Sequence, residues 1–198
     1  ETFNRDNVHL INLKENPIKQ ISSLSLDADK TYEIDTLILA TGFDAMTGAL
    51  TSIDITGRDG AKLKDQWESG AKSYLGLGIA NFPNLFTVTG PGSPSVLSNM
   101  MPSIEQHVNW ITDCIEWMNA NDKKVIESSK TAEDDWMVLV NEIADMTIFT
   151  DTKSWYNGSN IEDKANAFLP FIGVPVYTEM LEQIVAEDYK GFIFDRVN

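Results

Sequence analysis

The side chains that could carry chemistry in this sequence are few and scattered. The histidines are His9 and His107, and the single cysteine is Cys114. A zinc site needs several His, Cys or carboxylate ligands at close spacing, and no such spacing surrounds either histidine. Gly92-Ser93-Pro94 lacks the G-x-S-x-G turn that exposes a nucleophilic serine. The sequence therefore predicts neither a metal centre nor a Ser-His-Asp hydrolase.

Three further motifs have ordinary structural explanations. Asp27 and Asp29 are spaced like the first ligands of an EF-hand loop, but Tyr32 occupies the position that must be glycine. Asn157-Gly158-Ser159 has the form of a glycosylation sequon, but no basic-then-apolar signal segment opens the chain, so we expect a turn. The acidic run 133–135 suits the solvated start of a helix.

Composition narrows the classes of partner. The 198 residues include 15 Lys+Arg and 30 Asp+Glu, which gives a formal net charge of −15. Binding to nucleic acid or to an anionic membrane needs clustered basic side chains, so we expect neither partner. No apolar run approaches the ~20 residues of a membrane span. One cysteine permits no internal disulfide, and we expect a reducing, cytoplasmic location.

Two apolar runs that end at glycines are expected to position a site. Residues 36–40 lead into Thr41-Gly42, and residues 85–89 lead into Gly90. A strand that is apolar on both faces is typical of a covered parallel sheet. In open α/β sheets, ligands bind where such strands end in loops. No G-x-G-x-x-G sequence is present, so the chain has no dinucleotide-binding fingerprint of its own.

The remaining periodicities predict the other elements. Polar–apolar alternation predicts strands over 7–13, 18–26 and 32–40, with a turn at 27–30. Ser103 and Gln106 have capping-box spacing, so we expect a helix from about residue 103. Its apolar stripe is expected to be Ile104, Val108, Ile111, Ile115 and Met118. Further predicted elements are helices over 131–146 and 178–187, a final strand over 191–197, and an aromatic-rich loop over 149–175 that is a candidate binding element.

Five segments, in order along the chain, resemble the Baeyer–Villiger monooxygenases of the cyclohexanone and phenylacetone type. The second is similar to the family's A-T-G-F-D motif, and the last to its mobile S-W-x-x-G-x-N-I loop. Asp163 departs from the family's pattern, in which a glycine is usual. The segments are residues 1–8, 35–44, 90–100, 103–108 and 154–161.

The resemblance implies the C-terminal portion of an α/β flavoprotein with two dinucleotide-binding domains, a parallel sheet and helical additions. The complete enzyme would use FAD, NADPH and O2 to insert one oxygen atom next to a ketone carbonyl, giving an ester or lactone. The family's catalytic arginine would lie upstream, so we expect this chain to work with the upstream half of the same enzyme and to be inactive alone. The alternatives are a related flavin monooxygenase that oxygenates N or S, and a non-catalytic fragment that lacks cofactor.

By the same resemblance, residues 1–43 would complete an NADP-binding domain and residues 44–198 an FAD-binding domain. Trp155 would grip the cofactor ribose through its indole N–H, or simply pack in its loop. Met100 would form a flexible wall for bulky ketones, or fill the core. The residues expected to bind cofactor are Thr41, Gly42, Phe43, Asp44, Asn99, Met100 and Trp155. The residues expected to bind substrate are Ser95, Val96, Leu97, Ser98 and Met100.

Overall fold

The structure is a computed structural model that describes residues 2–42, 44–45, 47–95, 98–148, 150–152, 171 and 173–195. The chain forms two compact units, residues 1–42 and residues 43–198. Their assignment to NADP- and FAD-binding domains stays a prediction. The aromatic-rich loop falls almost entirely outside the described residues.

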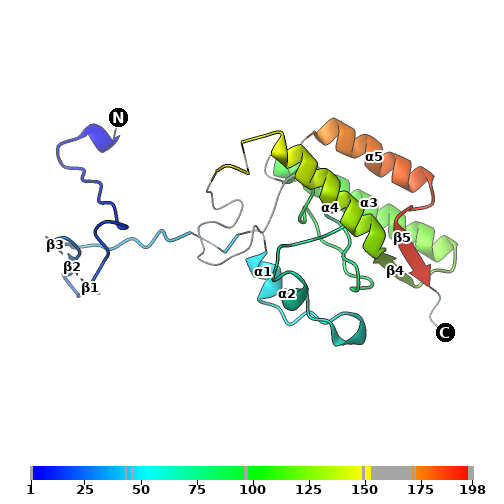
Figure 1. The fold of residues 1–198 in the computed structure, drawn as a ribbon, viewed down its shortest axis with the longest axis horizontal. Coiled ribbons are helices and arrows are strands. Elements are labelled where there is room, and N and C mark those ends of the chain that lie inside the picture. Colours follow the sequence, from blue (N-terminus) through cyan, green and yellow to red (C-terminus); the bar gives the residue numbers. More distant parts are fainter. Residues whose placement is uncertain are drawn as a thin grey trace. The chain divides into compact units, whose positions relative to one another are not determined.

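The first unit is built around a small antiparallel sheet. A 3₁₀ turn, η1 (Thr2–Asn4), precedes strands β1 (Gln20–Ile21), β2 (Ser25–Asp27) and β3 (Thr31–Glu33), which pair in the order β1-β2-β3 (Figure 1). The predicted turn between β2 and β3 is confirmed, with Asp27 opposite Thr31. The prediction of a strand over 7–13 is wrong. The described residues offer that segment no partner strand, and its Leu10 is 81% exposed.

The two apolar runs do not form a parallel sheet within the described residues. Residues 36–40 are irregular there, and Ile38 is 82% exposed. Residues 85–89 form only an isolated antiparallel bridge, from Phe86 to Gly78. Every ladder that the structure describes is antiparallel. A strand needs a neighbour for its backbone groups. The described residues provide no partner strand for 36–40 and only this short bridge for 85–89.

Three long helices are the largest elements of the second unit (Figure 1), and they share one buried cluster of side chains. Short elements come first: α1 (Gly48–Thr51), the 3₁₀ turn η2 (Arg58–Gly60) and α2 (Leu63–Gln66). The long helices are α3 (Met100–Ala120), α4 (Lys130–Asp145) and α5 (Val174–Ala186). Strands β4 (Val125–Ser128) and β5 (Phe192–Asp195) pair antiparallel.

Helix α3 exists where the sequence predicts it, but its cap and its buried face differ from expectation. The cap is Asn99, whose side chain accepts a hydrogen bond from Met101 N. The predicted capping box at Ser103 is therefore wrong. The predicted stripe is also out of phase, because Val108 and Ile115 are 46% and 45% exposed. The face that is buried comprises Ser103, His107, Trp110, Cys114 and Met118.

Helix α4 has a side-chain N-cap, Ser129, and a buried glutamate, Glu133, in its first turn. Ser129 caps it by accepting a hydrogen bond from Ala132 N at 3.1 Å. Glu133, which we expected in solvent, is fully buried. Helix α5 starts four residues before the predicted position, after Gly173, whose φ of +118° suits glycine.

The core of the second unit is aromatic and joins the three long helices. Trp110 and Trp136 from α3 and α4 belong to one buried cluster with Tyr177 from α5 and with Tyr74 and Leu75 from the preceding loop. A smaller cluster around Leu63 and Trp67 lies under α2. Among the described residues, no helix combines the length and apolar character needed to cross a membrane.

Candidate functional site

The residues expected to bind cofactor and substrate fall in three segments. The first, 41–44, spans the boundary in the sequence between the two units, and the second, 95–100, leads into α3. The third contains Trp155. Four of the expected residues lie outside the described residues, namely Phe43, Val96, Leu97 and Trp155.

Gly42 and Asp44 have different surroundings. Gly42 has a φ of +85°, and a Cβ placed on it would meet no atom within 4 Å. Its backbone is therefore open to close approach by another group. Asp44 lies against Gly48 at the start of α1, so closely that a Cβ on Gly48 would collide with the carboxyl group. Both Thr41 and Asp44 are exposed.

Residues 90–95 are buried, and hydrogen bonds join residues 90–91 to the earlier loop that contains Ser73 and Gly76. The N–H of Gly90 donates to the carbonyl oxygen of Gly76 at 3.1 Å. The hydroxyl of Ser73 donates to the carbonyl oxygen of Pro91 at 2.5 Å. These buried bonds fix the backbone of residues 90–91, because each unmade bond would leave a polar group without a partner.

An aromatic pair holds the next part of the loop. Nε1 of Trp136 donates to the carbonyl oxygen of Gly92 at 3.2 Å, and the N–H of Phe171 donates to the carbonyl oxygen of Ser93 at 3.1 Å. The two rings stack, with centroids 5.1 Å apart and planes 13° from parallel. A Cβ on Gly92 would lie 2.9 Å from Trp136 Nε1, so glycine is required for this approach.

A short serine chain joins this loop to α3. Ser95 is buried with a φ of +43°, and its carbonyl oxygen accepts from the hydroxyl of Ser98 at 2.9 Å. Since the Ser98 hydroxyl donates there, the hydroxyl of Ser103 donates to Ser98 Oγ at 2.7 Å. Ser98 and Met100 are half-buried and Asn99 is exposed. The segment 98–100 therefore has a fixed backbone and partly accessible side chains.

The entrance to the loop is held by a histidine. Thr89 has a φ of +52°, a left-handed conformation that is strained for a β-branched residue. Its N–H donates to Nδ1 of His107 at 3.0 Å. Because a backbone N–H can only donate, Nδ1 is the acceptor and the neutral ring carries its proton on Nε2.

The other side of His107 continues the hydrogen-bond chain. Nε2 lies 2.7 Å from the hydroxyl of Tyr177, which donates in turn to the carbonyl oxygen of Leu75 at 2.6 Å. Burial lowers the pKa of His107 to about 4 and raises the pKa of Tyr177 well above its usual value. Both groups are therefore neutral near pH 7, and each donor in the chain has an acceptor.

The arrangement positions backbone rather than supplying an acid or base. None of the anchoring groups His107, Trp136 and Tyr177 was predicted as a site residue. Their partners lie 18 to 102 residues away in the sequence, so no local pattern announces them. Among the described residues there is also no cluster of three or more His, Cys, Asp or Glu that could hold a metal ion.

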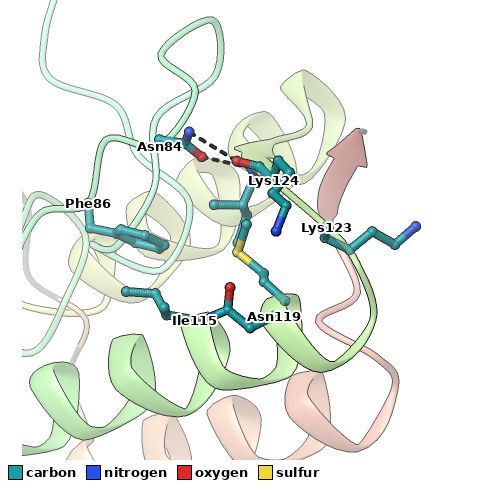
Figure 2. Close-up of a pocket in the computed structure, with 8 residues that line it drawn as sticks. Asn84, Phe86, Ile115, Asn119, Lys123 and Lys124 are labelled. Carbon is teal, nitrogen blue, oxygen red and sulfur yellow. Dashed lines mark hydrogen bonds between the residues drawn. The ribbon is translucent and has the colours of Figure 1, made fainter. Parts of the chain in front are cut away.

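Several surface hollows lie away from the predicted residues, and two of them border the long helices. Figure 2 shows the first, of about 300 Å³, with Phe86 and Ile115 in its wall. Asn84 in this wall is already bonded to the backbone of Lys124 and Ile126, and Lys123 points away from the hollow. The second, of about 390 Å³, lies between α4 and α5. The polar groups of the first hollow, shown in Figure 2, do not converge on one point, so we assign the first hollow no ligand.

Comparison with known proteins identifies the relatives of this chain. No protein-family profile matches it. Cyclohexanone 1,2-monooxygenase of Acinetobacter sp. is 40% identical over 194 residues, which cover 96% of this chain and 35% of the relative. Phenazine N-monooxygenase PhzNO1 of Lysobacter antibioticus is 39% identical over 196 residues, which cover 98% of this chain and 36% of that protein.

Solved structures agree. Cyclohexanone monooxygenase from Rhodococcus sp. Phi1, bound to NADP+, matches with a TM-score of 0.91 and 37% identity, covering 98% of this chain and 37% of that chain. OTEMO in complex with FAD and NADP matches with a TM-score of 0.88 and 34% identity, covering 98% and 36%. The fold is thus that of part of a two-domain flavin monooxygenase. Over the part that it spans, the chain is similar in sequence and fold to Baeyer–Villiger monooxygenases. That part is about a third of the length of these relatives.

Proposed function

We propose that the chain is part of an enzyme that uses FAD and NADPH to insert one atom of O2 next to the carbonyl of a ketone. NADPH supplies two electrons, one oxygen atom enters a C–C bond of the ketone, and the other leaves as water. The product is an ester or a lactone. The observation that carries the proposal is the agreement in sequence and fold, over nearly the whole chain, with cyclohexanone monooxygenases.

The residues around the start of α3 fit the edge of a flavin. The N-terminal end of this 21-residue helix carries the positive end of the helix dipole, which favours a group on which negative charge develops. Residues 98–100 lie at that end, where hydrogen bonds from Ser98, Ser103 and Met101 hold the segment in place. FAD, when bound, supplies the redox chemistry, while these residues orient it and shape the space for the ketone.

We propose the following division of the remaining roles. Gly42 lets the cofactor approach the backbone, since nothing fills the position of its missing Cβ. Trp155 binds NADP through its indole N–H, and Met100 with residues 95–98 forms the wall that faces the ketone. Residues 1–43 complete the NADP domain and residues 44–198 the FAD domain. The catalytic arginine comes from the upstream half of the enzyme, and the location is cytoplasmic.

The alternative is oxygenation of nitrogen, as the name of the phenazine N-monooxygenase describes for that relative. The test starts from the visible absorption spectrum of the purified complete enzyme, which should give close to one flavin per chain. Supplied with NADPH and air, it should convert cyclohexanone to its lactone faster than it oxidises N,N-dimethylaniline. A colourless protein would remove the flavin proposal. A yellow protein that oxidises only the amine would move the enzyme to the alternative class.

A further inference from the structure

The chain Thr89–His107–Tyr177–Leu75 joins three distant parts of the second unit. His107 is on α3, Tyr177 is on α5, and Leu75 and Thr89 lie on the two loop segments between α2 and α3. His107 and Tyr177 are 1% and 0% exposed. Both ring nitrogens of the histidine are used, so the residue has no spare nitrogen with which to act on a substrate.

What the histidine holds is a strained residue next to the predicted site. Thr89 is left-handed, and Gly90 directly after it begins the buried segment 90–95. Strain of this kind persists only where surrounding contacts impose it. The partly buried hydrogen bond from the N–H of Thr89 to Nδ1 of His107 fixes the backbone conformation of Thr89. It thereby sets the direction in which the chain enters the loop that follows.

We infer that His107 is a positioning residue of the proposed monooxygenase site: its bond to Thr89 sets the entry of the chain into residues 90–95, while its bond to Tyr177 holds the ring from α5. The inference rests on the proposed function for its effect on turnover, but the geometric part stands on this chain alone. We call the hydrogen-bond chain Thr89–His107–Tyr177–Leu75 the relay. It requires a neutral imidazole, and the burial of His107 favours the neutral form.

Two substitutions separate the two halves of the relay. His107→Asn keeps a carbonyl oxygen near the position of Nδ1, so it can still accept from Thr89, but it loses Tyr177. His107→Gln places an amide nitrogen near the position of Nε2, so it can still reach Tyr177, but it loses the acceptor for Thr89. Both remove the imidazole ring, so a purely structural role predicts similar damage from both.

The matched control is Gln106→Ala. Gln106 joins the same two helices, through a hydrogen bond from Nε2 to Thr178 Oγ1 at 2.8 Å, but it does not touch Thr89. This variant weakens the contact between α3 and α5 without altering the histidine.

The experiment uses the complete, FAD-loaded enzyme and two readouts. The first is hydrogen exchange of the Thr89 amide, which should be protected in the wild type, in His107→Asn and in Gln106→Ala, and should lose protection at least tenfold in His107→Gln. The second is the fraction of NADPH oxidation that yields lactone. That fraction should fall about tenfold to a hundredfold in His107→Gln, because a misplacement of about 1 Å can slow a reaction about a hundredfold, and much less in the other two.

Equal exchange at Thr89 in the two histidine variants would overturn the inference, as would equal loss of lactone yield in Gln106→Ala. If the wild type makes no lactone but the exchange pattern follows the prediction, the proposed function fails and the relay stands. If the lactone yield of the wild type is high and both histidine variants match it, the relay does not position the site.

Discussion

The carboxylate of Glu133 accepts a hydrogen bond from the N–H of Ala80 through Oε1 at 3.0 Å, while its Oε2 is buried without a hydrogen-bond partner. Burial raises the pKa of Glu133 above its ordinary value of 4.5, against the smaller lowering effect of the Ala80 bond. The buried site therefore favours the protonated carboxyl relative to the unfolded chain, where the group is solvated.

Replacing Glu133 by Gln should change how stability depends on pH. A raised pKa means that this group's contribution to stability is fully present below about pH 4.5 and is lost as the pH rises through the folded-state pKa. Glu133→Gln keeps an acceptor for Ala80 but cannot ionise. The thermal midpoint of the variant enzyme should therefore rise relative to that of the wild type as the pH increases above 4.5.

The control for this experiment is Glu142→Gln, at an exposed position on the same helix. Its midpoint should follow the wild type across the range. A constant difference between Glu133→Gln and the wild type at every pH would show that the carboxyl is not disfavoured by its burial.

Gly92→Ala should destabilise the enzyme by more than Gly60→Ala. Both glycines have a φ of +80°, so an alanine costs about 1 kcal/mol or more in backbone strain at either position. Only at Gly92 would the new Cβ also meet Trp136 Nε1 at 2.9 Å, and at Gly60 it would meet nothing within 4 Å. The difference between the two unfolding midpoints measures the tightness of the contact between the loop and Trp136. Equal losses would mean that Trp136 moves aside freely.

Trp155→Ala should weaken the binding of NADP to the complete enzyme by about 1–3 kcal/mol, if the indole donates to the cofactor. Trp155→Phe keeps a flat ring without the N–H, so it should recover only the part that comes from covering the cofactor. Titration of the cofactor against each purified variant measures both. Unchanged affinity and unchanged turnover in the Ala variant would remove Trp155 from the site.

Residues 1–198 expressed alone should bind ANS or aggregate, because the apolar run 36–40 has no partner strand among the described residues. Ile38 and Leu39 are 82% and 72% exposed. Ile38→Lys with Leu39→Lys should reduce ANS binding by the isolated chain. A monomer that unfolds cooperatively and binds no ANS would contradict this expectation.

The elements that the sequence predicts correctly are those whose signals are local. The turn between β2 and β3, the three long helices and the final strand follow from runs of neighbouring residues. The phase of α3 was missed because its buried face carries Ser103 and His107, which count as polar in any hydrophobic pattern. Each is buried only because a specific partner satisfies it.

The candidate site is predicted through resemblance. The side chains that hold its backbone, His107, Trp136 and Tyr177, are not predicted. Residues 95–100 are predicted to lie near cofactor and substrate only because residues 90–100 resemble the family's active-site loop. Glu133 was placed in solvent because acidic residues suit a helix start, yet its partner Ala80 is 53 residues away. Long-range hydrogen bonds to backbone atoms leave no spacing in the sequence from which they can be predicted.

The bond from Tyr177 to Leu75 also has a consequence for synthesis on the ribosome. The two residues are 102 positions apart, and translation proceeds at about 5–20 residues per second. Synthesis of the chain from Leu75 to Tyr177 therefore takes on the order of 5–20 s, and the hydrogen bond to the Leu75 carbonyl cannot form before then. His107 also lacks Tyr177 until α5 has been made, but Thr89 lies only 18 residues from His107, so the bond that holds the turn at Thr89 does not depend on α5.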